Sequence, residues 1–107
     1  MKIIIGIVQN DDSRNLLNHL MEAGFRATVI ATTGGFLREG NSTILIGTDR
    51  VDEAIRIITE NCHTRTQLVN PLPSVMEPGE LYMPHPIEVQ VGGAIVFVMD
   101  VEQFEKF

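Results

Sequence analysis

The residues best suited to binding chemistry lie in one stretch of the chain, between positions 26 and 47. Gly34-Gly35 can adopt backbone conformations barred to other residues and can expose N–H groups that surround an anion. Arg26 can donate paired, charged hydrogen bonds to a phosphate. Phe36 can stack on a planar base. Together these residues indicate a local site for a small anion that carries a planar ring.

Three further residues in the same stretch can read the edge and the face of such a ring. Asn41 and Thr28 carry the donors and acceptors needed at a base edge, and Gly47 leaves room for a ring against the backbone. We expect residues 25–32 and 41–48 to form adjacent antiparallel strands joined by the glycine-rich connector. In that arrangement all of these residues are predicted to converge in space.

Each of these residues also has an explanation that involves no ligand. Gly34-Gly35 can be a hairpin turn, and threonines such as Thr28 favour strands in general. Phe36 can belong to the core or to an interface, and Arg26 can pair with a surface carboxylate. The binding hypothesis therefore depends on all of them gathering in one region, and not on any single residue.

Residues that could carry catalysis or hold a metal ion are sparse. The three histidines, His19, His63 and His85, lack the spacing of metal ligands such as i, i+4 on a helix. Cys62 is the only cysteine, which excludes an intrachain disulfide and a cysteine-based zinc cluster. Its neighbour His63 is not a typical orienting base, so we expect a buried thiol. No GxxxxGK[ST] or GxGxxG motif is present, and we expect no enzyme, no metal site and no cofactor.

Length and charge restrict the possible partners. The chain has 107 residues, which is typical of one domain spanning 1–107. Eight Lys and Arg against 14 Asp and Glu give a net charge of −6, which argues against nucleic-acid polymers and anionic membranes. The longest apolar run, 91–99, has about half the ~20 residues of a membrane helix, and the β-branched N-terminus is typical of a strand rather than a signal peptide. We expect a cytoplasmic protein.

The hydrophobic pattern predicts six main elements. Strands are expected at 3–8, 25–32, 41–48 and 87–99, and helices at 12–23 and from Asp49 to about 61–62. The polar run from Asn10 to Ser13 and Asp49 are predicted to cap the two helices, and Gly24 to end the first in a left-handed turn. The order β-α-β-β-α-β predicts an α+β, ferredoxin-like fold, with one antiparallel sheet and both helices on one face.

Four segments interrupt or follow this pattern. The connector at 34–40 is short, whereas residues 63–85 lack clear periodicity and form a long loop of the kind that is often functional. Gly92-Gly93, inside the expected last strand, indicates a bulge or a place where another backbone or a ligand comes close. Residues 101–107 can form a short terminal helix.

Both faces of the predicted sheet are apolar, although two helices can cover only one face. Residues 3–8, 44–46 and 94–99 do not alternate between apolar and polar side chains, as strands with one solvated face do. The simplest explanation is that other subunits cover the second face, which predicts a closed oligomer. The alternative is that the 63–85 loop folds over it.

Several runs of sequence resemble one known family. They are Phe25-Arg26-Ala27-Thr28, Ala31-Thr32-Thr33-Gly34-Gly35-Phe36-Leu37, Gly40-Asn41 and the strand from Pro86 to Val98. These motifs resemble those of the P-II-like cyclic di-AMP receptors of the PstA/DarA type, and the resemblance spans essentially the whole chain. It includes the short 34–40 connector and the long 63–85 loop, which distinguish that family from nitrogen-regulatory P-II proteins.

The resemblance implies a homotrimer that binds cyclic di-AMP in clefts between adjacent subunits and is not an enzyme. The binding positions that it implies are Arg26, Thr28, Gly35, Phe36, Leu37, Asn41 and Gly47. Binding would rearrange the loops at 34–40 and 63–85 and so signal to a protein target that the sequence does not identify. The alternative is a P-II-like trimer that binds another nucleotide, such as ATP, or a divalent metal ion.

Three features depart from the family pattern. Gly24 stands where the family has asparagine, and Lys106 stands where a glutamine is usual. Residues 76–80, Met-Glu-Pro-Gly-Glu, stand in place of a Met-Gly-Gly segment. The resemblance therefore transfers the loop rearrangement less directly than it transfers the fold and the binding positions.

Overall fold

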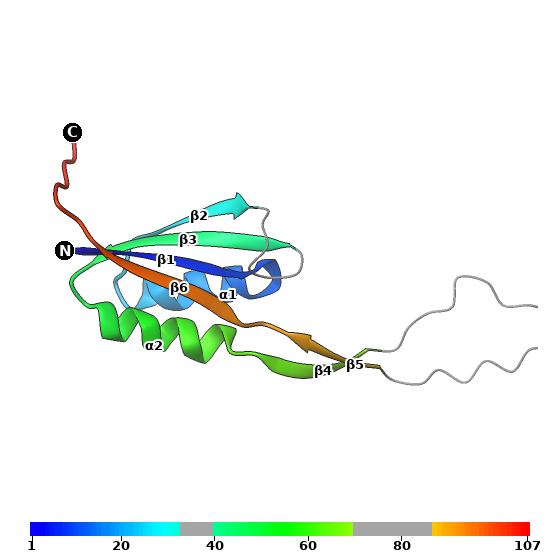
Figure 1. Ribbon diagram of the computed structural model, residues 1–107. Helices are drawn as coiled ribbons and strands as arrows, with labels where there is room; N and C mark the ends of the chain where they lie inside the picture. Colours follow the sequence, from blue (N-terminus) through cyan, green and yellow to red (C-terminus); the bar gives the residue numbers. More distant parts are fainter. Residues whose placement is uncertain (33–39, 70–86) are drawn as a thin grey trace, which may run out of the picture.

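The computed structural model describes residues 1–32, 40–69 and 87–107, which form a four-stranded sheet, two helices and a two-stranded arm (Figure 1). In chain order the elements are β1 (Lys2–Gln9), α1 (Asn10–Glu22), β2 (Ala27–Thr32), β3 (Asn41–Thr48), α2 (Val51–Cys62), β4 (Arg65–Val69), β5 (Ile87–Val91) and β6 (Ala94–Asp100). The sheet has the order β2-β3-β1-β6, and each neighbouring pair is antiparallel. This arrangement confirms the predicted α+β, ferredoxin-like fold.

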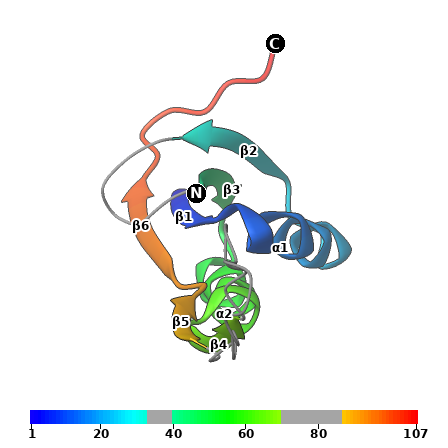
Figure 2. The same cartoon turned by 90° about the vertical axis from the view of Figure 1, so that its right-hand side faces the viewer.

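Both helices pack against the same face of the sheet and form the core with it (Figures 1 and 2). Alternation along β1 buries Ile4 and Val8 on this face, and the helical period of α1 buries Leu16 and Leu20. Within the described ranges, the buried apolar side chains are Ile4, Val8, Leu16, Leu20, Phe25, Ile44, Ile46, Ala54, Ile57, Ile58 and Cys62. Among the described residues, no helix has the length and apolar character needed to cross a bilayer.

The end of α1 is the left-handed turn that the sequence predicts. Gly24 has a φ of +87°. Its N–H donates to the carbonyl of Met21 at 3.0 Å, and the N–H of Phe25 donates to the carbonyl of Leu20 at 2.9 Å. This pair of bonds is a Schellman motif, which satisfies two helix-terminal carbonyls. The turn directs Phe25 into the core immediately before β2 begins.

Neither helix start is capped by a side chain, contrary to the prediction. Helix α1 begins at Asn10, two residues earlier than expected, and its N-cap Gln9 makes no capping side-chain bond. Helix α2 follows Arg50, whose side chain also makes no capping bond. Asp49 instead pairs with the N-terminal ammonium group of Met1, with 2.9 Å between nitrogen and Oδ1. An ion pair between distant parts of the chain thus replaces the local cap.

The predicted last strand is in fact two strands that belong to different sheets. Strand β6 lies beside β1 in the main sheet, whereas β5 pairs with β4, a strand inside the segment expected to be an irregular loop. The division falls at Gly92-Gly93, whose φ values of +80° and +92° a regular strand does not contain. As predicted, the glycine pair lets another backbone come close, because the N–H of Gly93 donates to the carbonyl of Cys62.

Strands β4 and β5 form an arm that extends past the end of the main sheet (Figure 1). The base of this β4–β5 arm is fastened to the start of α1 by two contacts. Arg65 donates to both carboxylate oxygens of Asp12, at 2.8 and 3.3 Å, and the Asp12 side chain is only 8% exposed. The N–H of Gly92 donates to Oε1 of Gln9 at 2.6 Å. The acidic residue assigned to a helix start is therefore the anchor of the arm.

The C-terminal residues 101–107 form neither a helix nor a strand, so the expected terminal helix is wrong. The N–H of Val101 donates to the carbonyl of Met1 at 3.2 Å, which keeps the chain extended as it leaves β6. Figure 1 shows this tail rising on the side of the sheet opposite the helices. The side chains of Phe104 and Phe107 are exposed.

The face of the main sheet turned away from the helices is apolar, and the described residues leave much of it exposed. Residues paired across the strands share a face, so the register places Ile5 beside Phe97 on one side and Leu45 on the other. The apolar members of this open face are Ile3, Ile5, Ile7, Ile30, Leu45, Ile95, Phe97 and Met99. Phe97 and Met99 are 43% and 48% exposed. The alternative cover, the 63–85 loop, lies mostly outside the described residues, and its described part, 63–69, contains strand β4 of the arm.

Candidate functional site

The strand register separates the predicted site residues into two groups. Thr28 lies opposite Leu45, near the end of the hairpin where β2 begins and β3 ends. Asn41 lies opposite Thr32, at the other end of the same strand pair. Asn41 and Gly47 are therefore about 20 Å apart along β3, at ~3.3 Å per residue. The prediction that all of these residues converge within one chain is wrong, because antiparallel pairing brings together only residues equally far from the turn.

Two of the predicted residues, Arg26 and Gly47, line the same pocket. This pocket has a volume of about 330 Å³ and is lined by Met1, Gly24, Phe25, Arg26, Gly47, Thr48, Asp49 and Arg50. Gly47 is exposed, and a Cβ built on it would meet only the Met1 sulfur, at 3.8 Å. A side chain at Gly47 would thus begin in ordinary van der Waals contact with Met1 and with no closer neighbour. We call this space the Arg26 pocket.

Thr28 is outside the lining of the Arg26 pocket and lies on the open apolar face. It pairs with Leu45, so it shares the face of the sheet that the helices do not cover, and it is exposed. Asn41 falls on the same face by strand alternation, but it is 3% exposed. The remaining predicted residues, Gly35, Phe36 and Leu37, lie outside the described residues.

Arg50 is a pocket residue that the sequence reasoning did not identify. Its guanidinium carbon lies 4.1 Å from the centre of the Phe25 ring. Nη2 donates to the carbonyl of Ala23 at 2.9 Å, and Nη1 donates to Glu53 Oε2 at 3.0 Å. These contacts tie the turn after α1 to the start of α2 and so fix one wall of the Arg26 pocket. No local pattern indicates them, because Ala23 is 27 positions from Arg50 in the sequence.

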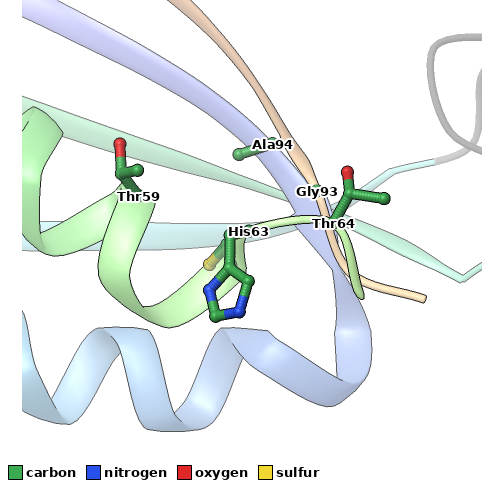
Figure 3. A pocket seen from close by; sticks show the side chains of 6 residues that line it. Thr59, His63, Thr64, Gly93 and Ala94 are labelled. Carbon is green, nitrogen blue, oxygen red and sulfur yellow. The ribbon is translucent and has the colours of Figure 1, made fainter. Parts of the chain in front are cut away.

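A second, smaller pocket lies where α2 ends and β6 begins (Figure 3). Its volume is about 200 Å³, and its lining is Thr59, Cys62, His63, Thr64, Gly93 and Ala94. Burial, with a smaller contribution from the Asp12 charge, raises the pKa of the Cys62 thiol to about 12. The Cys62 thiol is buried, as the sequence predicts, and a thiol that stays protonated is a poor nucleophile. Within the described parts of the chain, no three His, Cys, Asp or Glu side chains gather as they would around a metal ion.

Comparisons with known proteins identify the family to which this arrangement belongs. A solved structure of a functionally unknown protein from Pediococcus pentosaceus is similar to this chain, with 42% sequence identity and a TM-score of 0.77. The match covers 99% of this chain and 96% of that one. The family model described as cyclic-di-AMP receptor matches residues 1–107. The chain therefore belongs to the cyclic-di-AMP receptor family.

Proposed function

We propose that this protein is a cytoplasmic signalling receptor that binds cyclic di-AMP between the subunits of a homotrimer. The observation that carries the proposal is the division of the site residues between the two ends of the β2–β3 pair. One chain supplies Arg26, Thr28 and Gly47 at one end, and the neighbouring chain supplies Asn41 together with Gly35, Phe36 and Leu37. A ligand with two bases and two phosphates can use both groups only at a junction between subunits.

The open apolar face supports the trimer. It carries eight apolar side chains from all four strands, and Thr28 lies on the same face. Exposed apolar surface on this scale is typical of an interface, because its burial stabilises association by roughly 25 cal/mol per Å². Subunits that cover this face would bring a neighbouring chain close to Thr28. The ligand site and the interface are thus parts of one surface.

The charges around the Arg26 pocket support an anionic ligand in spite of the net charge of −6. Arg26 is exposed, and none of the ion pairs within the described residues involves it. An arginine without a carboxylate partner retains its donors for a phosphate. We assign Arg26 to a phosphate of the ligand, and Thr28 and the Gly47 backbone to the base.

Relay of the signal requires segments that respond to the ligand. We propose that binding rearranges the loops at 34–40 and 63–85 and presents them to a protein target. The 34–40 loop contains three of the proposed binding residues. Strand β4, which lies within 63–85, belongs to the β4–β5 arm, and this arm is anchored to the start of α1 through Asp12 and Arg65. A receptor of this kind works by binding and release, and we propose that it has no catalytic activity.

Titration calorimetry with cyclic di-AMP tests the proposal, with light scattering to measure the mass of the folded protein. We expect one ligand for each subunit of a trimer. Arg26→Ala should weaken binding by on the order of 1.5–3 kcal/mol, the value of a charge-assisted hydrogen bond. Arg14→Ala, which removes an exposed arginine from α1, is the matched control and should bind as the parent does. The proposal is rejected if the folded trimer gives no heat with ~100 µM ligand. It is also rejected if light scattering shows a stable monomer at micromolar concentration. ATP and cyclic di-GMP serve as comparison ligands.

A further inference from the structure

We propose that Arg50 is a second ligand-binding arginine, which stacks the plane of its guanidinium group on a base of the bound dinucleotide. This inference rests on the proposed function and extends it, because it names the side chain that stacks on a base in the Arg26 pocket. Arg50 lies outside the set of binding positions drawn from the sequence.

The guanidinium group of Arg50 is held in one orientation by three contacts. One face lies on the ring of Phe25, at 4.1 Å from the guanidinium carbon to the ring centre. One edge donates to the carbonyl of Ala23 at 2.9 Å, and another donates to Glu53 at 3.0 Å. A planar cation fixed on a buried aromatic ring loses little further freedom when it stacks on a ligand.

The other face of this guanidinium group is turned toward solvent. The Arg50 side chain is 48% exposed, although Phe25 beneath it is buried. Because Phe25 covers one face and two edges are bonded, this exposure belongs mainly to the opposite face. Gly24 lies beside the Nη2 edge of the guanidinium group, where a Cβ would make an ordinary van der Waals contact at 3.6 Å. Arg50 and Gly47 both line the Arg26 pocket of about 330 Å³, so the proposal places the base between them, against the uncovered face of Arg50.

The charges of the two pocket arginines indicate different tasks. Glu53 compensates the charge of Arg50, whereas Arg26 pairs with no carboxylate in the described parts of the chain. Phosphate recognition requires free charge and free N–H donors, which Arg26 retains. Stacking requires only a planar, polarisable face, which Arg50 retains, and bases stack on arginine planes in protein complexes. The geometry thus assigns the phosphate to Arg26 and a base to Arg50.

Four variants test this assignment by calorimetry with cyclic di-AMP at several salt concentrations. Arg50→Met removes the plane and the charge, and Arg50→Lys keeps the charge without the plane. Arg56→Met is the matched control, because Arg56 lies in α2, the helix that follows Arg50, and pairs with Glu60 at 3.1 Å but lies outside the pocket. We expect both Arg50 variants to raise the Kd about tenfold and the control to leave it unchanged. The dependence of Kd on salt should keep the slope of the parent protein, whereas Arg26→Met should flatten it.

The binding measurements distinguish failure of the role assigned to Arg50 from failure of the proposed function. If the parent binds cyclic di-AMP and Arg50→Met binds equally well, the role of Arg50 is wrong and the proposed function stands. If Arg50→Lys restores full affinity, Arg50 acts as a charge and does not stack. If Arg50→Met flattens the salt dependence as Arg26→Met does, Arg50 contributes charge to phosphate binding and its assignment to a base is wrong. If the parent does not bind the ligand, the proposed function itself fails. Arg50→Lys keeps the test decisive if Arg50→Met does not fold.

Discussion

Replacing Gly92 with alanine should destabilise this protein far more than the same change at Gly24. The two glycines have similar backbone angles, with φ values of +80° and +87°, so the left-handed conformation costs each alanine about the same, ~1–2 kcal/mol. Their surroundings differ. A Cβ at Gly24 would meet only the end of the Arg50 side chain, at 3.6 Å. A Cβ at Gly92 would lie 2.4 Å from Nη1 of Arg65 and 2.6 Å from the carbonyl oxygen of His63.

The expected difference in stability between the two variants depends on which groups a Cβ at Gly92 would displace. The His63 carbonyl has to shift by roughly 0.8 Å to restore an ordinary contact, and such overpacking costs about 1–3 kcal/mol. Arg65 has to leave its position against the carboxylate of Asp12, which weakens a charge-assisted bond worth about 1.5–3 kcal/mol. We therefore expect Gly92→Ala to be at least ~2 kcal/mol less stable than Gly24→Ala. For a domain of this length, that corresponds to a Tm lower by on the order of 10 °C.

Urea denaturation followed by circular dichroism, at one protein concentration, measures both variants against the parent. Hydrogen exchange then locates the damage, and the amides of β4 and β5 should lose protection first because the Gly92 contacts hold the base of the arm. Equal stability of the two alanine variants would refute the reasoning, because it would mean that the close contact at Gly92 is absent in solution. In an Arg65→Met background, Gly92→Ala should cost less, since one of the two clashing groups is gone.

Two further predictions concern buried polar groups. Arg65→Met leaves the Asp12 carboxylate, which is 8% exposed, without its cation, and urea denaturation should show a loss of stability of about 1.5–3 kcal/mol. The double variant Asp12→Leu, Arg65→Met should lose less stability than the sum of the losses of the two single variants. Losses that simply add would show that the two residues are not coupled. The pKa of Cys62 is raised from 9.0 to about 12, so between these values the unfolded thiol ionises while the native thiol stays protonated. Stability is therefore retained below about pH 9 and falls above it by up to ~1.4 kcal/mol per pH unit, a slope that denaturation of Cys62→Ala at pH 8 to 10.5 should lack. An identical slope in both proteins would contradict the assignment to Cys62.

The sequence predicts the main elements well because each has a strong local signal. Strand β3 was predicted with its observed bounds, and Gly24 marks the end of α1. The β4–β5 arm was missed because its pairing is not local: Arg65 pairs with Val91 across a long intervening segment. Gly92-Gly93 indicates the position of the break between β5 and β6. It does not indicate that the two halves of the predicted strand belong to different sheets.

The acidic residues near the helix starts show a similar limit. Asp12 and Asp49 fit a local explanation, since carboxylates favour the positive end of a helix. Their observed partners are Arg65, 53 positions away from Asp12, and the terminal ammonium group of Met1. A local pattern predicts where a carboxylate is tolerated. It does not predict which distant cation reaches that carboxylate once the chain has folded.

In the candidate site, the sequence predicts suitable residue types but not their positions relative to one another. The sequence identifies Arg26, Thr28, Asn41 and Gly47 as groups suited to binding. The prediction that they lie close together in one chain is wrong because of the antiparallel pairing of β2 and β3. In an antiparallel pair, residues near the turn face one another and residues far from it face one another, so Thr32 meets Asn41 and Thr28 meets Leu45. Strand boundaries alone would have been enough to predict two groups.

That separation links binding to assembly. Under the proposed function, a single chain offers half a site at each end of the β2–β3 pair, and neighbouring chains cover the open apolar face between these ends. Neighbouring chains that bury this face can join the Arg26 pocket of one subunit to the Asn41 end of another. Because such a ligand would bind the assembled form better than the separated chains, it must also stabilise the assembly, by about 2.7 kcal/mol when its concentration is 100 times the Kd. On this reasoning the apolar residues of the open face are as much a part of ligand recognition as Arg26.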